Sequence, residues 1–172
     1  MSEPQSSLWA FSLSVYANAA VHAECLDLQD RHSIDVNLLL FCAYVGAVHG
    51  AVLSDTEVRQ AASIVGEWHS SIVKRLLEAR RALKPFATEL SPIGSLAATL
   101  RTSVKATELE AERLEQMMLE GWSTLRVEAW QRAQPAEAIA ANLRALFAIC
   151  GGSAQRAELP THLVAAALAV AC

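Results

Sequence analysis

The chain has 172 residues, 53% of them hydrophobic, and a formal net charge of −4. This length suits one well-packed domain and is short for two. The acidic charge argues against nucleic acid or an anionic membrane surface as the main partner, because both require a basic protein surface. Alanine is the strongest helix former, and with only 7 Gly and 5 Pro the composition favours an all-α fold.

Two helices are predicted near the N-terminus. The first runs from Ser6 or Ser7 to about Ala17, and the second covers Ala20 to His32. Residues 1–6 are expected to form a disordered tail. They include no Lys or Arg, so the apolar segment that follows is not predicted to be a secretory signal. No segment has the length and apolar character of a transmembrane helix.

The next helix is predicted to form the centre of the fold. Asp35 is suited to cap it, since an Asp side chain accepts hydrogen bonds from the first free backbone N–H groups of a helix. The residues that follow, Val36 to His49, are apolar nearly all round, a pattern typical of a helix buried on every side. Gly50 is predicted to end it.

Ser54-Asp55-Thr56-Glu57 is a capping box that marks the start of a long helix. This helix is predicted to reach about Lys84 and to be terminated by Pro85. Its basic residues gather in the last turns, where cations complement the helix dipole. The expected buried stripe consists of Val58, Ala61, Val65, Trp68, Ile72, Leu76, Ala79 and Leu83.

A further long helix is predicted to begin at Ser91-Pro92, after a connector over 86–91, because proline is well tolerated in a first turn. Gly121 is expected to bend or interrupt it. The glutamates between Glu108 and Glu120 are expected to lie mainly off its buried stripe. That stripe is predicted to consist of Leu100, Val104, Thr107, Ala111, Leu114, Met118, Trp122 and Leu125.

Two alanine-rich helices complete the chain, one from Pro135 to Cys150 and one from Pro160 or Thr161 to the C-terminus. No internal repeat or low-complexity linker divides the sequence. We therefore predict a single domain over residues 1–172, an all-α bundle of six or seven helices around the buried central helix at about 36–49.

The sequence lacks the motifs of the common catalytic and metal sites. Its four cysteines have no C-x-x-C spacing, so they are expected to be buried, reduced thiols. The two Glu-x-x-His pairs of a di-iron bundle are absent, as are a Gly-x-Ser-x-Gly nucleophile elbow and a phosphate-binding P-loop. We expect no metal, no cofactor and no catalytic residue, and a cytoplasmic location.

The densest polar cluster precedes the central helix and includes Gln29, Asp30, His32, Asp35 and Asn37. It could fix the polar end of a small or acyl ligand, or His32 could accept a proton while Asp30 or Asp35 orients it. Helix capping accounts for the same residues without a ligand, because Asp35 suits a helix start and His32 suits the last turn of the preceding helix.

Two tryptophans and two charged segments are candidates for partner contacts. Trp9 lies near the N-terminus and Trp130 lies beyond the regular stripe, and tryptophan is enriched at binding hot spots. The cations from Lys74 to Lys84 and the glutamates from Glu108 to Glu120 could form two complementary faces within the bundle. The cations could equally form a docking surface for an acidic partner.

Three segments resemble a known family. Leu8 to Tyr16 matches a leading LWxFSLxVY, Gln29-Asp30 matches a QD pair, and Asp35 to Cys42 matches DVNLLLFC. In order and spacing they resemble an uncharacterised family of short proteobacterial proteins, a domain of unknown function. The resemblance spans nearly the full length and implies a bacterial cytosolic helical protein, but it supplies no activity.

The sequence leaves three functional hypotheses, in this order. The first is a non-enzymatic helical module that binds a protein partner or a second copy of itself. The second is a binding protein for a small or acyl ligand, with its polar site at residues 29–37. The third is an enzyme that uses His32 with Asp30 or Asp35.

Overall fold

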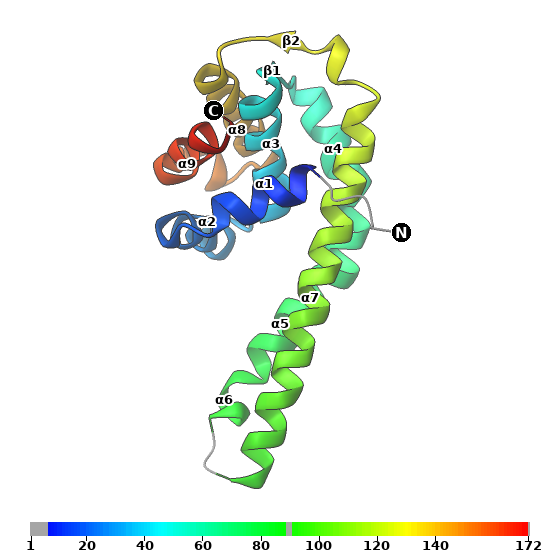
Figure 1. Ribbon diagram of the computed structural model, residues 1–172, viewed down its shortest axis with the longest axis vertical. Coiled ribbons are helices and arrows are strands. Elements are labelled where there is room, and N and C mark those ends of the chain that lie inside the picture. The colour runs from blue at the N-terminus through cyan, green and yellow to red at the C-terminus, as the bar shows by residue number, and fades with distance from the viewer. Residues whose placement is uncertain (1–6, 89–90, 172) are drawn as a thin grey trace. The chain divides into compact units, whose positions relative to one another are not determined.

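The computed structural model describes residues 7–88 and 91–171 and confirms the all-α fold (Figure 1). The chain forms two compact units. Unit 1 falls within residues 1–64 and 116–172, and unit 2 comprises residues 65–115. The boundaries lie inside two helices, α4 (Asp55–Trp68) and α7 (Pro92–Thr124). The single domain over 1–172 stays a prediction, and the expected tail at 1–6 lies outside the described residues.

Unit 1 holds most of the helices, and their bounds match the predicted ones within one or two residues. Its one pair of strands within the described residues was not predicted, since each strand has only two residues. In chain order, besides parts of α4 and α7, its elements are α1 (Ser7–Tyr16), α2 (Ala19–His32), α3 (Val36–His49), β1 (Ala51–Val52), the 3-10 turn η2 (Val127–Ala129), β2 (Gln131–Arg132), α8 (Pro135–Cys150), the 3-10 turn η3 (Ala154–Arg156) and α9 (Thr161–Ala171).

The helix α3 forms the core of unit 1, as its sequence predicted. Every residue from Asn37 to Ala47 is buried, and α1, α2, α8 and α9 all pack against α3. Asp35 caps the helix, because its Oδ1 accepts hydrogen bonds from the backbone N–H of Asn37 at 2.9 Å and of Leu38 at 3.3 Å. Gly50 ends it with a left-handed backbone, φ 57°, that glycine adopts without strain. No helix in the described part of the chain is long and apolar enough to cross a membrane.

The last helix, α9, is capped by a side chain from α2. The carboxylate of Glu24 accepts hydrogen bonds from the backbone N–H of His162 at 3.0 Å and of Leu163 at 2.9 Å, and lies 2.7 Å from His162 Nδ1. Burial raises the pKa of Glu24, but these hydrogen bonds outweigh burial and hold its pKa below the ordinary value of 4.5. Glu24 thus ties α2 to α9.

We expect Glu24→Gln to lower the free energy of unfolding by about 1 kcal/mol at neutral pH, the usual contribution of a helix cap. Because the folded pKa of Glu24 is depressed, its carboxylate stabilises the fold above the unfolded pKa, and this contribution is lost as the pH falls through the folded pKa. Urea denaturation of both proteins at about pH 7 and about pH 3 measures the difference. A difference that is undiminished at acid pH would contradict the cap.

Unit 2 departs from the prediction of one helix from Asp55 to Lys84. The helix α4 is followed by a π-helical turn, η1 (His69–Val73), then by α5 (Lys74–Ala82) and the single turn α6 (Lys84–Ala87). Pro85 does not terminate a helix. It lies in the first turn of α6, where its missing N–H has no helical partner to lose.

The π turn also shifts the buried stripe of unit 2. A π turn closes with one more residue than an α turn, so the inward-facing position moves by one. Ile72, predicted to be buried, is 38% exposed, and Val73 is 4% exposed in its place. Ala79 is likewise exposed, and Arg80 takes the inner position beside it.

The predicted stripe of α7 is largely wrong. Ser91 caps this helix as expected, with its Oγ accepting from Gly94 N–H at 3.0 Å, and Gly121 does not interrupt it. However, Leu100 and Leu114 are exposed, as are Thr107, Met118 and Leu125. The residues of α7 that are buried at helical spacing are Glu108, Ala111, Glu115, Leu119 and Trp122.

Candidate functional site

The π turn η1 is the most unusual backbone feature of unit 2. Such turns are rare and occur often at functional sites, because the wider turn redirects the side chains beside it. Here η1 begins directly after Trp68, at His69. Within unit 2 both side chains reach α7.

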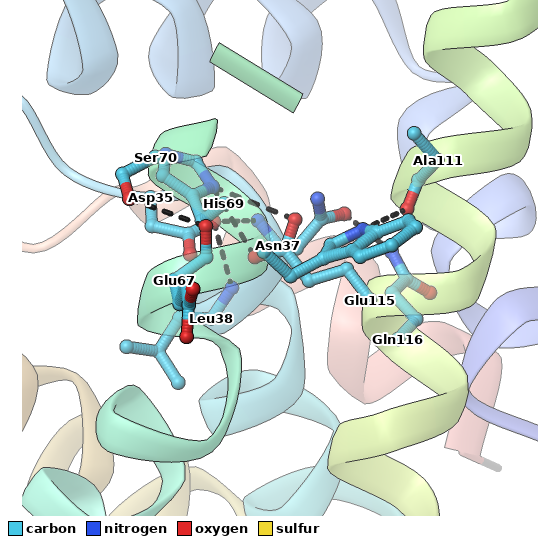
Figure 2. A network of polar contacts seen from close by, with 10 residues as sticks. Asp35, Asn37, Leu38, Glu67, His69, Ser70, Ala111, Glu115 and Gln116 are labelled. Atoms are coloured by element: carbon cyan, nitrogen blue, oxygen red, sulfur yellow. Dashed lines mark hydrogen bonds and ion pairs between the residues drawn. The ribbon is translucent and has the colours of Figure 1, made fainter. Parts of the chain in front are cut away.

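Three side chains, one each from α4, η1 and α5, bond to α7. The indole Nε1–H of Trp68 donates to the carbonyl of Ala111 at 3.0 Å. His69 Nδ1 lies 3.2 Å and 3.4 Å from the two carboxylate oxygens of Glu115 (Figure 2). Farther along, the guanidinium of Arg80 binds Glu108 through two hydrogen bonds, one of them 3.0 Å from Nη2 to Oε1. Polar pairs thus replace apolar contacts along the inner face of the hairpin.

Among the polar contacts of unit 2, the pair of His69 and Glu115 is the one whose residue types are most often used in chemistry. Glu115 is fully buried, whereas the His69 side chain is 30% exposed. A carboxylate that orients a reachable imidazole is found around proton acceptors and around metal-bound histidines. We interpret the pair as a link that holds the π turn against α7.

This link was not predicted from the sequence. His69 lies two positions after Glu67, which is not the spacing of a Glu-x-x-His motif, and Glu115 was expected to lie off the buried stripe. The two residues are 46 positions apart. Only the register between two helices brings them together, and no local pattern encodes that register. Ala111 and Glu115 are four residues apart and therefore lie on the same face of α7. A correctly predicted buried stripe would have included both.

Of the five polar residues predicted between 29 and 37, the structure brings two together at the start of α3. Asp35 is the helix cap. Asn37 is buried, and its Oδ1 accepts from Gln116 Nε2 at 2.9 Å (Figure 2). The side chain of Asn37 therefore faces the core of unit 1 rather than water. The contact with Gln116 was not predicted from the sequence.

The other three polar residues lie on α2. His32 Nδ1 is 2.8 Å from Ser153 Oγ, which joins the end of α2 to the residue before η3. Asp30 is exposed and Gln29 is half-buried. A binding role for these residues stays a prediction, as does a role for His32 as proton acceptor.

The two tryptophans proposed for partner contacts differ in exposure. Trp9 is half-buried on α1. Trp130 is only 5% exposed, and its ring lies 5.7 Å from that of Trp122. Burial leaves Trp130 little surface to offer a partner, and its binding role remains untested.

An open groove of about 610 Å³ lies in unit 1 between the end of α8, η3 and the start of α9. Its polar lining includes Arg144 and Glu158, and Phe147 supplies an aromatic wall. None of the five polar residues predicted between 29 and 37 lines it.

Exposed apolar side chains are concentrated in unit 2. Among the described residues, seven large apolar side chains are exposed in unit 2, against six in unit 1, which is more than twice as long. The most exposed of the seven are Leu96 at 72%, Ile93 at 68%, Phe86 at 55% and Leu100 at 53%. A two-helix hairpin has one inner face, so these side chains have no core of their own to enter. They are the strongest candidate for a functional surface.

The comparisons with known proteins give one match. A family model described as "Protein of unknown function (DUF2390)" matches residues 7–119. Neither the curated proteins nor the solved structures that were compared contain a match to the chain.

Proposed function

Because the chain belongs to the DUF2390 family of proteins of unknown function, we propose a function from its own surface: a helical module that binds a protein through unit 2. The carrying observation is the exposed apolar seam of α7, formed by Ile93, Leu96 and Leu100. Soluble proteins rarely leave such side chains clustered in water unless the cluster is a contact surface.

The spacing of the seam supports a helical contact. Its residues recur at three and then four positions, which places them on one face of α7. Phe86, on the single turn α6, is a further exposed apolar residue, and it lies close to this seam in the sequence. Helix recognition commonly uses anchors at this spacing, because they interlock with the side chains of a second helix.

The cytoplasm is the compartment that we propose. Cys25, Cys42 and Cys150 are all free thiols, which suits a reducing environment. Burial raises the pKa of Cys25 to about 12 and that of Cys42 further, so both are inert small core side chains. Cys150 was expected to be buried but lies exposed at the end of α8, and Cys172 lies outside the described residues.

Photo-crosslinking in cells tests the binding surface. A photoreactive amino acid placed at Leu96 is expected to give protein adducts on irradiation. The matched control position is Leu13 on α1, whose side chain is 52% exposed and equally apolar. Adducts that form equally at both positions, or at neither, would contradict the proposed surface. The purified variants should retain the helical circular dichroism of the parent protein.

A further inference from the structure

The charges of unit 2 are divided along the length of its hairpin. Arg80 pairs with Glu108, and α5 and α7 run side by side in opposite directions, with α6 at the far end (Figure 1). The far end, residues 80–107, has five Lys and Arg against one Glu. The opposite end, residues 65–79 and 108–115, has three Lys and Arg against six Glu. The hairpin is therefore basic at one end and acidic at the other.

An exposed stripe of α7 runs from the basic end to the acidic end. Six exposed residues recur along it at alternating steps of three and four, the spacing of a helix-pairing heptad: Ile93, Leu96, Leu100, Ser103, Thr107 and Glu110. The first three are bulky and the next two are small. Bulky and small side chains interlock when two such stripes lie antiparallel, because the bulky half of each then meets the small half of the other.

We propose that this stripe binds the same stripe of a second copy of the chain, antiparallel and across a two-fold axis between Leu100 and Ser103. The inference rests on the proposed function and names its partner. Leu100 packs on Ser103 of the second copy, and Leu96 packs on Thr107 of the second copy. Glu110 then lies at the start of the second copy's α7, where the helix dipole favours a carboxylate.

Charge complementarity is the reason to choose a second copy. A partner of uniform charge would be attracted to one end of the hairpin and repelled by the other, whereas a second copy placed antiparallel matches both ends. Unit 2 as a whole has eight Lys and Arg against seven Glu, so two copies carry little overall repulsion. A membrane surface fits less well, because helices that lie on a bilayer present a broad apolar face, and this stripe includes two hydroxyls and a carboxylate.

Sedimentation equilibrium of the purified chain tests the pairing. The parent is expected to form a reversible dimer, and Glu110→Lys to raise its dissociation constant about tenfold or more, since attraction becomes repulsion. The matched control is Glu128→Lys in unit 1, because both glutamates are exposed and lie 3.7 Å from an arginine. The control should dimerise like the parent. A monomeric parent, equal weakening in both variants, or no weakening in either would overturn the inference.

Disulfide trapping tests the direction of the pairing. Cys150→Ser and Cys172→Ser leave only two buried thiols in the chain. In this background, a mixture of the Leu96→Cys and Thr107→Cys proteins is expected to form a disulfide under mild oxidation. Neither protein alone should do so, because the two copies of one position would lie about 16 Å apart, beyond the reach of a disulfide. Crosslinks within a single variant, or none in the mixture, would overturn the antiparallel arrangement.

The adducts formed at Leu96 in cells distinguish this inference from the proposed function. An adduct with a second copy of the chain near Thr107 supports both. An adduct with a different protein leaves the proposed function standing and overturns the second copy as its partner. A lipid or nucleic-acid adduct, or the absence of any specific adduct, would end both.

Discussion

Gly46→Ala is expected to destabilise unit 1 by about 3 kcal/mol or more, one of the largest effects of a single methyl group in this protein. A Cβ at position 46 would lie 2.5 Å from the backbone N and 2.7 Å from the Cα of Ile139. Backbone atoms cannot rotate away as a side-chain end can, so α3 and α8 would have to separate. Since these two helices form the largest contact of the unit, separation would loosen the core around α3.

Urea denaturation followed by circular dichroism measures this effect. Gly121→Ala provides the matched control, because Gly121 is also in a helix of unit 1 and has open space around its Cβ position. There the methyl group should stabilise the protein by up to about 1 kcal/mol, since alanine loses less backbone entropy than glycine in a helix. Similar effects at both positions would show that α3 and α8 do not approach this closely.

The helix ends of this chain were predictable because they depend on local chemistry. Asp35, Ser54 and Ser91 each bond to backbone N–H groups within three residues, so the sequence near the helix start contains the whole interaction. Gly50 is likewise sufficient to end α3. The buried character of α3 was also predictable, since a helix that is apolar all round can only be stable inside a core.

The buried face of unit 2 was not predictable, because hydropathy alone assigns carboxylates to the surface. Glu108 and Glu115 are buried because Arg80 and His69 lie opposite them, and these partners offset the cost of removing a polar group from water. The π turn compounds the error by moving the inner position from Ile72 to Val73. Both errors have one cause, which is that interhelical register is a property of two segments and not of one.

The candidate surface on α7 was not predicted for the same reason, which is that the buried face of this helix was assigned incorrectly. The hydrophobic periodicity of the sequence predicts that Leu100 is buried, so it gives no indication of an exposed apolar surface at this position. The buried positions of α7 are instead Glu108, Ala111 and Glu115, and Leu96 and Leu100 near the start of the helix are exposed. The basic residues of α5 had already suggested an acidic partner, and only the structure associates them with an apolar seam in one unit.

Asn142→Leu is expected to cost about 3 kcal/mol, because it removes the partner of several buried backbone groups and fills their place with apolar atoms. Asn142 is fully buried on α8. Its Oδ1 accepts from Leu53 N–H at 2.7 Å, and its Nδ2 donates to the carbonyls of Ala51 at 2.9 Å and Cys42 at 3.2 Å. The side-chain amide of Asn142 thus forms hydrogen bonds with three backbone groups in the segment that runs from α3 through β1 toward α4.

Asn142→Asp distinguishes the role of the accepting oxygen of this amide from that of its donating NH₂ group. A carboxylate can still accept from Leu53 N–H but cannot donate to the carbonyls of Ala51 and Cys42, and it would be a buried charge beside them. We therefore expect it to be at least as harmful as Asn142→Leu at neutral pH and less harmful in acid, where the carboxyl group is protonated and donates again. Arg144→Leu is the control on the same helix, exposed and with the same new side chain, and should change the free energy of unfolding by less than about 0.5 kcal/mol. If Asn142→Leu unfolds at the same urea concentration as this control, the amide does not hold the α3–α4 connection.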